Sequence, residues 1–483
     1  MGGDRPSGFV DRPKPWGGRL KLRRILLAYL KYAYIRLPVS ELARYRLKSA
    51  LFRVLTPWLR QSASYLFWSE QRRLSRQNPE PGRAPAGAER GQGERGDGDQ
   101  RPGLLLIDSC TPTPDRDSGS MDVFNSIRIF LALGFRVSFI PESNLLDLGP
   151  YTRALEDLGV ECLHAPRISS VKSWLQAWGA TYDAVMLFRA PVAIRHLSHV
   201  RRYCPQARVI FSTIDLHFLR ESRQSGTTPE PTTAWNPLHR AELDCIQRAD
   251  KTIVISEAER RWLEAAIPGL QLALVPLVRE LPASREVAFE DRAGMAFIGN
   301  FQHPPNVDAV RYFLEEIWPE IHRQLPEVVF YIVGSYLPGL LNIQANEGVV
   351  ALGYVEDLDA IFGSIRLTVA PLRFGAGLKG KVVTSLGYGV PAVVSSIAAE
   401  GMGLVDGEEV LVADGVEAFR DQVLNAYRDQ RLWERLAREG RAAAQRLYSL
   451  EVSRQAYREI FSELKLPGLA DGAESGPTGQ RAN

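Results

Sequence analysis

Two lysines and a glycine-rich turn are the residues of this sequence best suited to chemistry. Gly375, Ala376 and Gly377 leave backbone amides uncovered by side chains, and Lys379 and Lys381 follow at the start of a predicted helix. Unpaired N–H groups and the helix dipole favour negative charge at such a position, and lysines there need an anionic ligand or a nearby carboxylate. The pattern predicts an anion site. The alternative is a tight turn with solvated lysines, because a glycine loop alone is a weak signal.

The segments around this turn predict one unit of a parallel sheet. The apolar run 365–369 predicts a buried strand that ends at Pro371. Val382 and Leu386 then give the next segment one apolar helical face, and a second strand is predicted from Ala392 to Ser395. Strand, turn, helix and strand together form a right-handed crossover.

A second candidate for chemistry is the pair Asp215 and His217, which follow a strand predicted over residues 208–211. In an extended segment, alternation places both side chains on one face. They are then the best polar groups for catalysis in the first half of the chain. The alternative is that Asp215 caps a turn and His217 packs beneath a helix.

The loop after the first predicted strand carries three acidic residues, Asp108, Asp115 and Asp117. Turn chemistry and helix capping explain them more simply than a metal site, so no metal is predicted. Ser118 and Gly119 add a hydroxyl and a bare amide at the carboxyl end of a strand, where open α/β sheets bind ligands.

A second series of predicted strands, each ending in small or polar residues, indicates another sheet of the same kind. The residues that follow its strands are Gly299, Asn300, Gly334, Tyr354 and Val355. Repeated strand, small-residue turn and helix is typical of a Rossmann-like sheet. The fold class predicted is therefore α/β, with two Rossmann-like, doubly wound parallel-sheet domains facing a cleft.

The length and composition bound the domain count and the compartment. A chain of 483 residues predicts about three domains. Its four cysteines are scattered without metal-ligand spacing, as expected of free thiols in a reducing cytosol. No signal peptide and no apolar run of membrane-spanning length is visible, so we expect a cytosolic protein or one on a membrane surface.

The N-terminal extension, residues 1–77, is basic. Residues 1–80 hold 17 Lys and Arg against 5 Asp and Glu, a balance of +12, so the remainder carries −9 of the total of +3. Two helices are predicted, over residues 19–36 and 40–60, the second capped by Ser40. Its apolar stripe consists of Leu47, Leu51, Leu55 and Trp58.

Such basic amphipathic helices predict contact of residues 19–60 with an anionic membrane surface. The alternative is a helical pair that packs on the catalytic domains with its arginines solvated. No recognition motif supports binding to nucleic acid, which is not expected as a partner. The predicted units are residues 1–77, a flexible linker at 78–102, domains at 103–283 and 284–449, a closing helix at 450–466 and a disordered tail at 467–483.

From Leu104 to Leu464 the chain resembles the glycosyltransferase family 4 enzymes, the bacterial glycosyl transferases of group 1, which adopt the GT-B fold. The resemblance is clearest in PLRFGAGLKGKVVTSLGYGVPAVVSSIAAEGM, which begins at Pro371. It implies that the turn at Gly375 receives the diphosphate of a nucleotide-sugar, with Glu400 and Gly401 beside it.

The same resemblance implies a donor-binding set drawn from both sheets. The turn at Gly299 approaches the diphosphate, the region of Tyr354 approaches the nucleobase, and the loop holding Ser118 lies near the sugar. The full implied set is Ser118, Gly119, Gly299, Asn300, Gly334, Tyr354, Val355, Gly375, Ala376, Gly377, Leu378, Lys381, Thr384, Glu400 and Gly401.

One departure from the family concerns two glutamates, with seven residues between them, that most members carry around the lysine-bearing loop. Ala376 and Thr384 stand at those places, so both carboxylates are missing. Thr384 offers a hydroxyl, and Arg373, Lys379 and Lys381 remain to neutralise a diphosphate. The donor is left open, and loss of activity is an alternative.

The sequence thus predicts a metal-independent GT-B glycosyltransferase without a cofactor. It would move a sugar from a nucleotide-diphospho-sugar to a glycan or lipid-linked glycan in cell-surface polysaccharide or lipopolysaccharide biosynthesis. The predicted catalytic residues are Asp215, His217, Arg373 and Lys379, and retention of configuration is implied by the resemblance. The predicted location is cytoplasmic, or peripheral on the inner face of the cell membrane. The alternatives are a non-catalytic scaffold that binds sugar-nucleotides and an epimerase of the same fold.

Overall fold

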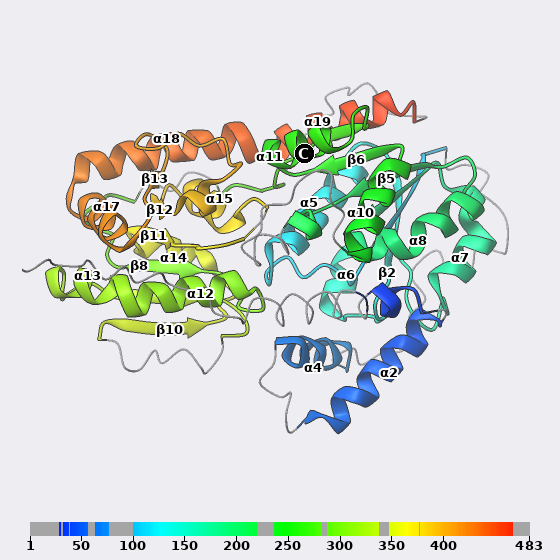
Figure 1. Cartoon of the computed structure of the whole chain (residues 1–483), viewed down its shortest axis with the longest axis horizontal. Coiled ribbons are helices and arrows are strands. Elements are labelled where there is room, and N and C mark those ends of the chain that lie inside the picture. The colour runs from blue at the N-terminus through cyan, green and yellow to red at the C-terminus, as the bar shows by residue number, and fades with distance from the viewer. Residues whose placement is uncertain are drawn as a thin grey trace, which may run out of the picture.

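The computed structural model describes residues 29, 32–37, 39–56, 63–76, 100–219, 236–282, 287–337, 347–375 and 377–466. Ala376, nearly all of the predicted linker, the predicted tail and most of the helix predicted over residues 19–36 lie outside these residues. The described chain forms two parallel α/β units side by side, with two N-terminal helices below the first of them (Figure 1).

The first sheet has seven parallel strands in the order β3-β2-β1-β4-β5-β6-β7. The strands are β1 (Gly103–Asp108), β2 (Arg136–Pro141), β3 (Glu161–Cys162), β4 (Ala184–Phe188), β5 (Arg208–Ser212), β6 (Lys251–Val254) and β7 (Leu272–Leu274). Every residue of β1 is buried, because helices cover both faces of the sheet. Leu105 and Ile107 enter the core on one face, and Leu104 and Leu106 enter the core on the other.

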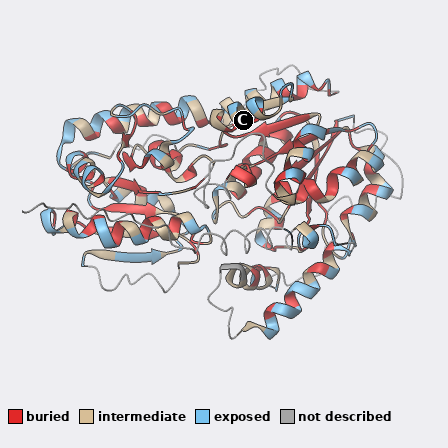
Figure 2. Cartoon of the chain, in the orientation of Figure 1, coloured by how far each residue is buried: buried red, intermediate tan, exposed pale blue. Residues whose placement is uncertain are grey.

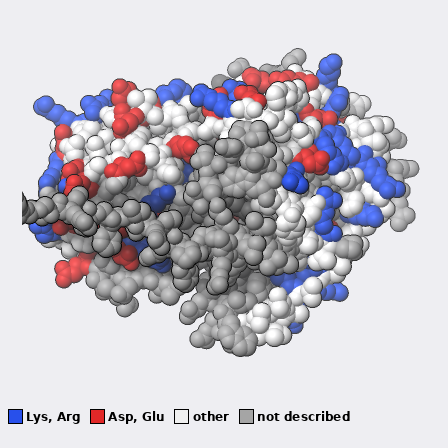
Figure 3. All heavy atoms as spheres, viewed as in Figure 1, with Lys and Arg blue, Asp and Glu red and all other residues white. Residues whose placement is uncertain are grey.

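The helices of the first unit lie between its strands along the chain. They are α5 (Ser118–Ala132), α6 (Pro150–Asp157), α7 (Val171–Trp178), α8 (Ala190–Tyr203), α10 (Pro237–Arg248) and α11 (Glu257–Ala266), with a 3₁₀ turn at Gly179–Thr181. Asp117 caps α5, as predicted, by accepting the Ser120 amide at 2.9 Å. On the face shown in Figure 3, Lys and Arg gather over α7 and α8, whereas the second unit shows both signs of charge.

The second sheet has six parallel strands in the order β10-β9-β8-β11-β12-β13. They are β8 (Met295–Ile298), β9 (Phe330–Val333), β10 (Val349–Gly353), β11 (Leu367–Ala370), β12 (Ala392–Val394) and β13 (Leu411–Val412). The helices are α12 (Pro304–Tyr312), a π-helical turn (Phe313–Ile317), α13 (Trp318–Gln324), α14 (Leu358–Ser364), α15 (Gly380–Gly387), α16 (Ser396–Ala399), α17 (Val416–Arg428) and α18 (Gln430–Tyr448).

The strand order determines where a ligand binds in each unit. In both sheets the chain reverses its direction of travel next to the first strand, between β1 and β4 and between β8 and β11. Open parallel sheets bind ligands at the carboxyl ends of such neighbouring strands. The turns after these four strands are therefore the places to look for a site.

The last helix, α19 (Leu450–Glu463), returns to the first unit and packs on α5. The rings of Tyr457 and Phe461 lie 4.7 and 5.6 Å from that of Phe130, measured between centroids. The chain thus crosses between the units twice, which ties the second unit to the first.

The N-terminal helices α2 (Glu41–Val54) and α4 (Ala63–Arg76) pack on the first unit, and Ser40 caps α2 as predicted. Two residues of the predicted apolar stripe do not make this contact, since Leu47 and Leu51 are 63% and 55% exposed. Leu55 is half-buried, and Trp58 lies outside the described residues. The side of α2 that carries Glu41, Arg44 and Ser49 is buried instead, and most of the rest of the helix is exposed (Figure 2).

A buried charge cluster holds α2 in place. The carboxylate of Glu142, just after β2, is contacted by Arg44 from α2 at 3.4 Å and by Arg195 from α8. Glu41 accepts the Val171 amide at 3.3 Å, which joins α2 to α7. These ion pairs explain why the helix turns its charged side inward, since unpaired buried charges would be costly.

Candidate functional site

The two sheets face each other through the N-termini of α5 and α15. Ser118, the first residue of α5, accepts a hydrogen bond from Arg279, and Gly380, the first residue of α15, lies against both side chains. A Cβ at position 380 would collide with them, so only glycine fits. Arg279 is already paired with the buried carboxylate of Asp122. It is therefore the two helix N-termini, meeting at one point between the units, that favour an anion there.

The glycine turn after β11 lies against the first unit. Gly377 has φ of +69°, which favours glycine, and a Cβ there would lie 3.4 Å from the Cβ of Asp215. Lys379 is 8% exposed, and its ammonium group donates to the Gly377 carbonyl. Two groups of residues that the sequence proposed separately, the lysine loop and Asp215, are thus neighbours where the two units meet.

Lys381 lies deeper, under the turn after β8. Its ammonium group donates to the side-chain oxygen of Asn306 and lies 4.1 Å from the centre of the Phe297 ring. A Cβ at Gly299 would be 3.1 Å from this nitrogen. Burial, with the charge of Lys379, lowers the pKa of Lys381 to about 7. The lysine is therefore poised between charged and neutral forms near neutral pH.

The expectation that alternation aligns Asp215 and His217 in an extended segment is wrong. Ile214 has φ of +62°, and a helical turn begins at His217. The two side chains nevertheless meet, with His217 Nε2 3.4 Å from Asp215 Oδ1. The turn in the backbone brings them together.

Two buried glutamates hold this turn, and sequence reasoning missed both. Glu242 accepts the amides of His217 and Phe218 at 3.0 Å each, and Glu259 accepts that of Leu216 at 3.2 Å. Burial raises the pKa of Glu259 to about 7, and the charge of Asp215 acts in the same direction. Glu259 lies three residues after the helix cap Ser256. This spacing is that of a capping box, a pattern in the sequence from which Glu259 could have been found.

The carboxyl edge of the first sheet also holds an arginine that the sequence did not indicate. Arg189, directly after β4, donates to Asp108 at 2.9 Å and approaches within 3.1 Å of a Cβ built at Gly119. Burial lowers its pKa, but the charges of Asp108 and Asp117 more than offset this effect and raise the pKa overall. Arg189 is therefore a fixed cation beside the start of α5.

A third contact between the units involves Asp115 and Arg116. The hydroxyl of Tyr354 donates to Asp115 at 2.6 Å, and the Arg116 guanidinium lies 4.0 Å from the centre of the Tyr354 ring. The side chain of Asn300 donates to the Arg116 carbonyl at 3.1 Å. Asp115 therefore serves as an interdomain acceptor, and the loop predicted to approach the nucleobase touches the first unit.

The remaining predicted residues have mainly structural surroundings. Arg373 forms a fork with both oxygens of Asp308 at 2.9 and 2.6 Å, so its charge is already matched. Gly334 approaches the Gly299 carbonyl so closely that no side chain fits. Leu378 packs on the core of the second unit, Thr384 and Val355 are half-buried, exposed Glu400 ends α16, and Gly401 lies against Ser256.

Among the residues that the structure describes, Glu41, Glu142 and His196 are the group close enough to hold a metal ion. Arg44 and Arg195 already contact Glu142, and a cation would have to compete with them. Burial lowers the pKa of His196 to about 3, so its ring is neutral. This group is better explained as the anchor of α2 than as a metal site.

Comparison with known sequences places the second unit in a family. Residues 292–429 match the family described as glycosyl transferases group 1. A protein described as an uncharacterized 44.6 kDa protein in the cps region of Klebsiella pneumoniae is 23% identical over 229 residues, 44% of this chain and 56% of that protein. The chain thus spans about half the length of this curated relative.

Solved structures resemble the whole fold. Sucrose-phosphate synthase of Thermosynechococcus elongatus matches with a TM-score of 0.55 at 14% identity, covering 76% of this chain and 99% of that one. HepE of Anabaena, solved with UDP and glucose, matches with a TM-score of 0.56 at 13% identity, covering 74% of this chain and 99% of that one. The chain therefore has the GT-B fold, and residues 292–429 of its second unit match the group 1 glycosyl transferases.

Proposed function

We propose that the protein transfers a sugar from a nucleotide-diphospho-sugar to a glycan. The observation that carries the proposal is the lysine loop: Lys379 and the turn at Gly377 sit at the switch point of the second sheet, against Asp215. Two findings support the proposal. The match to the glycosyl transferases of group 1 includes this loop, and HepE, which has the same fold, was solved with UDP and glucose.

The proposed roles follow from charge and position. Lys379, Lys381 and the amides at the start of α15 stabilise negative charge on the departing diphosphate, with Arg373 joining them if it leaves Asp308. Asp215 and His217 orient the sugar and the acceptor. Since these groups can supply the stabilisation that a metal gives elsewhere, a metal-independent reaction is part of the proposal. Retention of configuration is added to the proposal on the family resemblance alone.

A thermal-shift screen with UDP-, GDP-, ADP- and dTDP-sugars tests the donor site first. A ligand that binds only the folded state raises Tm, so one selective rise identifies the base. Lys379→Ala should abolish that rise, whereas Arg431→Ala, an exposed substitution on α18, should keep it. If no nucleotide-sugar shifts the folded protein, the donor site is refuted.

A non-catalytic scaffold is the second candidate, favoured by one observation: neutral residues stand where the family usually has two glutamates, at positions 376 and 384. Turnover separates the candidates. A protein that binds a nucleotide-sugar but yields no product with a panel of glycan and lipid-linked acceptors is the scaffold. Release of UDP and a free sugar without acceptor would indicate the epimerase.

The acceptor is proposed to be a surface polysaccharide or its lipid-linked precursor. The relative from the cps region supports this, as does the exposed apolar stripe on α2, where Leu47, Leu51 and Val54 are 63%, 55% and 71% exposed. None of the described helices has the length and apolarity to cross a bilayer. Contact with the inner face of the membrane would therefore be peripheral, and Leu47→Ser with Leu51→Ser should reduce binding to anionic vesicles.

A further inference from the structure

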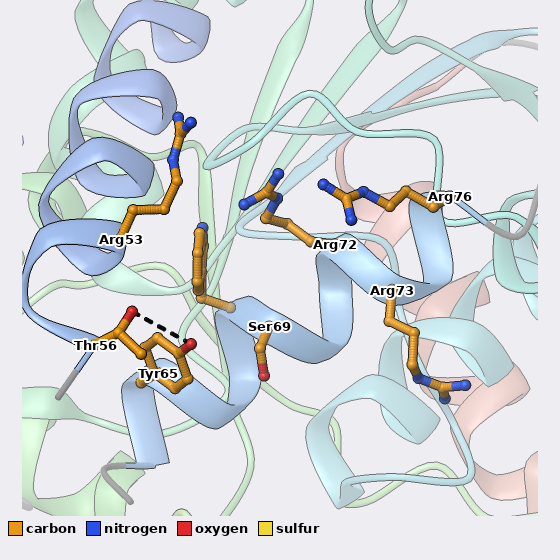
Figure 4. Close-up of a pocket in the computed structure, with 8 residues that line it drawn as sticks. Arg53, Thr56, Tyr65, Ser69, Arg72, Arg73 and Arg76 are labelled. Carbon is orange, nitrogen blue, oxygen red and sulfur yellow. Dashed lines mark hydrogen bonds between the residues drawn. The ribbon is translucent and has the colours of Figure 1, made fainter. Parts of the chain in front are cut away.

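A cavity of about 500 Å³ lies between α2 and α4, and arginine makes up half of its lining (Figure 4). The lining residues are Arg53, Thr56, Tyr65, Trp68, Ser69, Arg72, Arg73 and Arg76. Arg53 comes from α2, Thr56 follows the end of that helix, and the others come from α4. The cavity therefore depends on the pairing of the two helices and is distinct from the lysine loop of the second sheet.

One of the four arginines is already neutralised. Arg73 donates to both oxygens of Glu70, at 2.9 and 2.6 Å, and Figure 4 shows it pointing away from Arg72 and Arg76. No carboxylate among the described residues forms an ion pair with Arg53, Arg72 or Arg76. Three positive charges are thus left without a matching negative charge in this part of the chain.

The charges of these three guanidinium groups all reach one neighbouring residue, Tyr45 of α2. Burial raises the pKa of Tyr45, while the charges of Arg72, Arg76 and Arg53 each act to lower it. Figure 4 shows the guanidinium group of Arg76 pointing toward that of Arg72, and like charges placed in this way repel one another. An anion bound between them would remove that repulsion and stabilise the pair of helices.

The wall of the cavity is held in place by aromatic contacts. The Trp68 ring lies 5.3 Å from those of Phe52 and Tyr65, between centroids, and its N–H donates to Ser49 at 2.9 Å. The Arg72 guanidinium lies 5.0 Å from the centre of the Trp68 ring. A guanidinium that rests on an aromatic ring loses less freedom when it binds, so the site is preorganised.

We propose that Arg53, Arg72 and Arg76 form a binding site for a phosphate or diphosphate group, separate from the donor site. The planar fork of arginine matches phosphate oxygens in pairs, and three converging cations match the charge of a diphosphate better than that of one carboxylate. Serine and threonine hydroxyls from Ser69 and Thr56 complete a polar lining.

The position of the site connects it to the cleft. Glu70, the partner of Arg73, also lies 3.6 Å from Arg116, and Arg116 stacks on Tyr354 of the second unit. A phosphate held between α2 and α4 would therefore lie beside the first unit, near its contact with the second. Two sources carry this chemistry: the headgroup of a membrane lipid and a soluble phosphorylated molecule.

The test titrates inorganic diphosphate into full-length protein carrying Lys379→Ala, which disables the donor loop, and follows the heat of binding. Adding Arg72→Gln with Arg76→Gln should weaken the affinity at least about tenfold. The matched control, Arg46→Gln with Arg431→Gln, removes two exposed charges outside the cavity and should change the affinity less than about twofold. Arg53→Gln, from the other helix, should act in the same direction as the double variant.

A second arm repeats the comparison with vesicles of phosphatidylcholine containing phosphatidylglycerol. Loss of vesicle binding in the cavity variant but not in the control, with weak binding of free diphosphate, identifies a lipid headgroup. If the cavity variant loses affinity for diphosphate but keeps its binding to vesicles, the ligand is a soluble phosphorylated molecule. Equal behaviour of cavity and control variants in both arms overturns the proposal. Because neither arm uses a nucleotide-sugar, the result is independent of the proposed enzymatic activity.

Discussion

The two sheets of this protein share a strand order, but their carboxyl edges differ in charge. At the first edge, β1 and β4 end in Asp108 and Arg189, which pair with each other at 2.9 Å. At the second edge, the lysines donate to uncharged oxygens, Lys379 to the Gly377 carbonyl and Lys381 to Asn306. The first edge is neutralised from within, whereas the second carries positive charge at glycine-lined turns.

This difference explains how one scaffold serves two tasks. A parallel sheet offers the same crevice at each switch point, and the side chains there decide what it holds. An edge with matched charges keeps its geometry without a ligand and can orient a neutral sugar. An edge that presents lysines and helix N-terminal amides favours an anion, as the departing diphosphate requires.

The largest expected effect comes from removing charge at the second edge. Lys379→Ala should lower kcat/KM by about 10²–10³-fold, because a preorganised cation is lost where negative charge develops. The measurement is steady-state turnover with the donor identified by thermal shift. Arg431→Ala serves as the control, and a Lys379→Ala enzyme within about threefold of wild type would show that the second edge does not carry the reaction.

Breaking the Asp108–Arg189 ion pair at the first edge should lower the free energy of unfolding more than it lowers the affinity for the donor. Asp108→Asn leaves Arg189 without its closest carboxylate, and the loss should be about 2–3 kcal/mol, because a quarter of the Arg189 side chain is exposed and screened. A fall in Tm of about 5 °C is expected by calorimetry. An unchanged Tm would mean that the pair does not stabilise the edge, and the comparison between the two edges would fail.

The sequence predicted the second edge better than the first, for a physical reason. The features of the second edge are local: a strand, glycines and lysines within one run from Leu367 to Lys381. The first edge depends on distant pairs, since Asp108 and Arg189 are 81 residues apart and Ser118 and Arg279 are 161 apart. Local patterns reveal turns and caps, but single charged residues far apart do not reveal that they meet.

Two other features of the fold could not be predicted from the pattern of apolar and polar residues. Strands β3 and β13 contain two residues each, too few to show a period of alternation. The amphipathic stripe of α2 was recognised correctly as a pattern, but a stripe does not say whether it faces the protein or the solvent. Here the buried ion pairs of Arg44 with Glu142 decided the orientation, and the stripe faces outward.

The pH dependence of donor binding sharpens the contrast between the edges. The pKa of Lys381 lies at about 7 when free and should rise when a diphosphate binds, so affinity should fall up to about tenfold per pH unit above 7. A nucleotide-sugar is the suitable ligand, since its diphosphate does not titrate in this range. Lys381→Met should bind more weakly and lose this dependence between pH 7 and 9, as isothermal titration would show.

The same lysine has an opposite effect on stability. Its folded pKa lies below the ordinary value of 10.5, so the unfolded chain binds more protons between pH 7 and 10.5. The free energy of unfolding should therefore rise with pH in this window, and the Lys381→Met protein should lack that contribution. Stability that falls with pH in wild type relative to Lys381→Met would show that the lysine is charged in the folded state.

The smallest effect is expected where the two edges touch. Tyr354→Phe removes the hydroxyl that donates to Asp115 at 2.6 Å but keeps the ring beneath Arg116. The loss of this hydrogen bond should raise KM for the donor about fivefold, near 1 kcal/mol, because closure of the cleft becomes less favourable. Tyr331→Phe on β9 is the control, since no described residue hydrogen-bonds its hydroxyl. If both variants have the same KM, the contact between Tyr354 and Asp115 holds the two units in one position without aiding the donor, and the edges act independently.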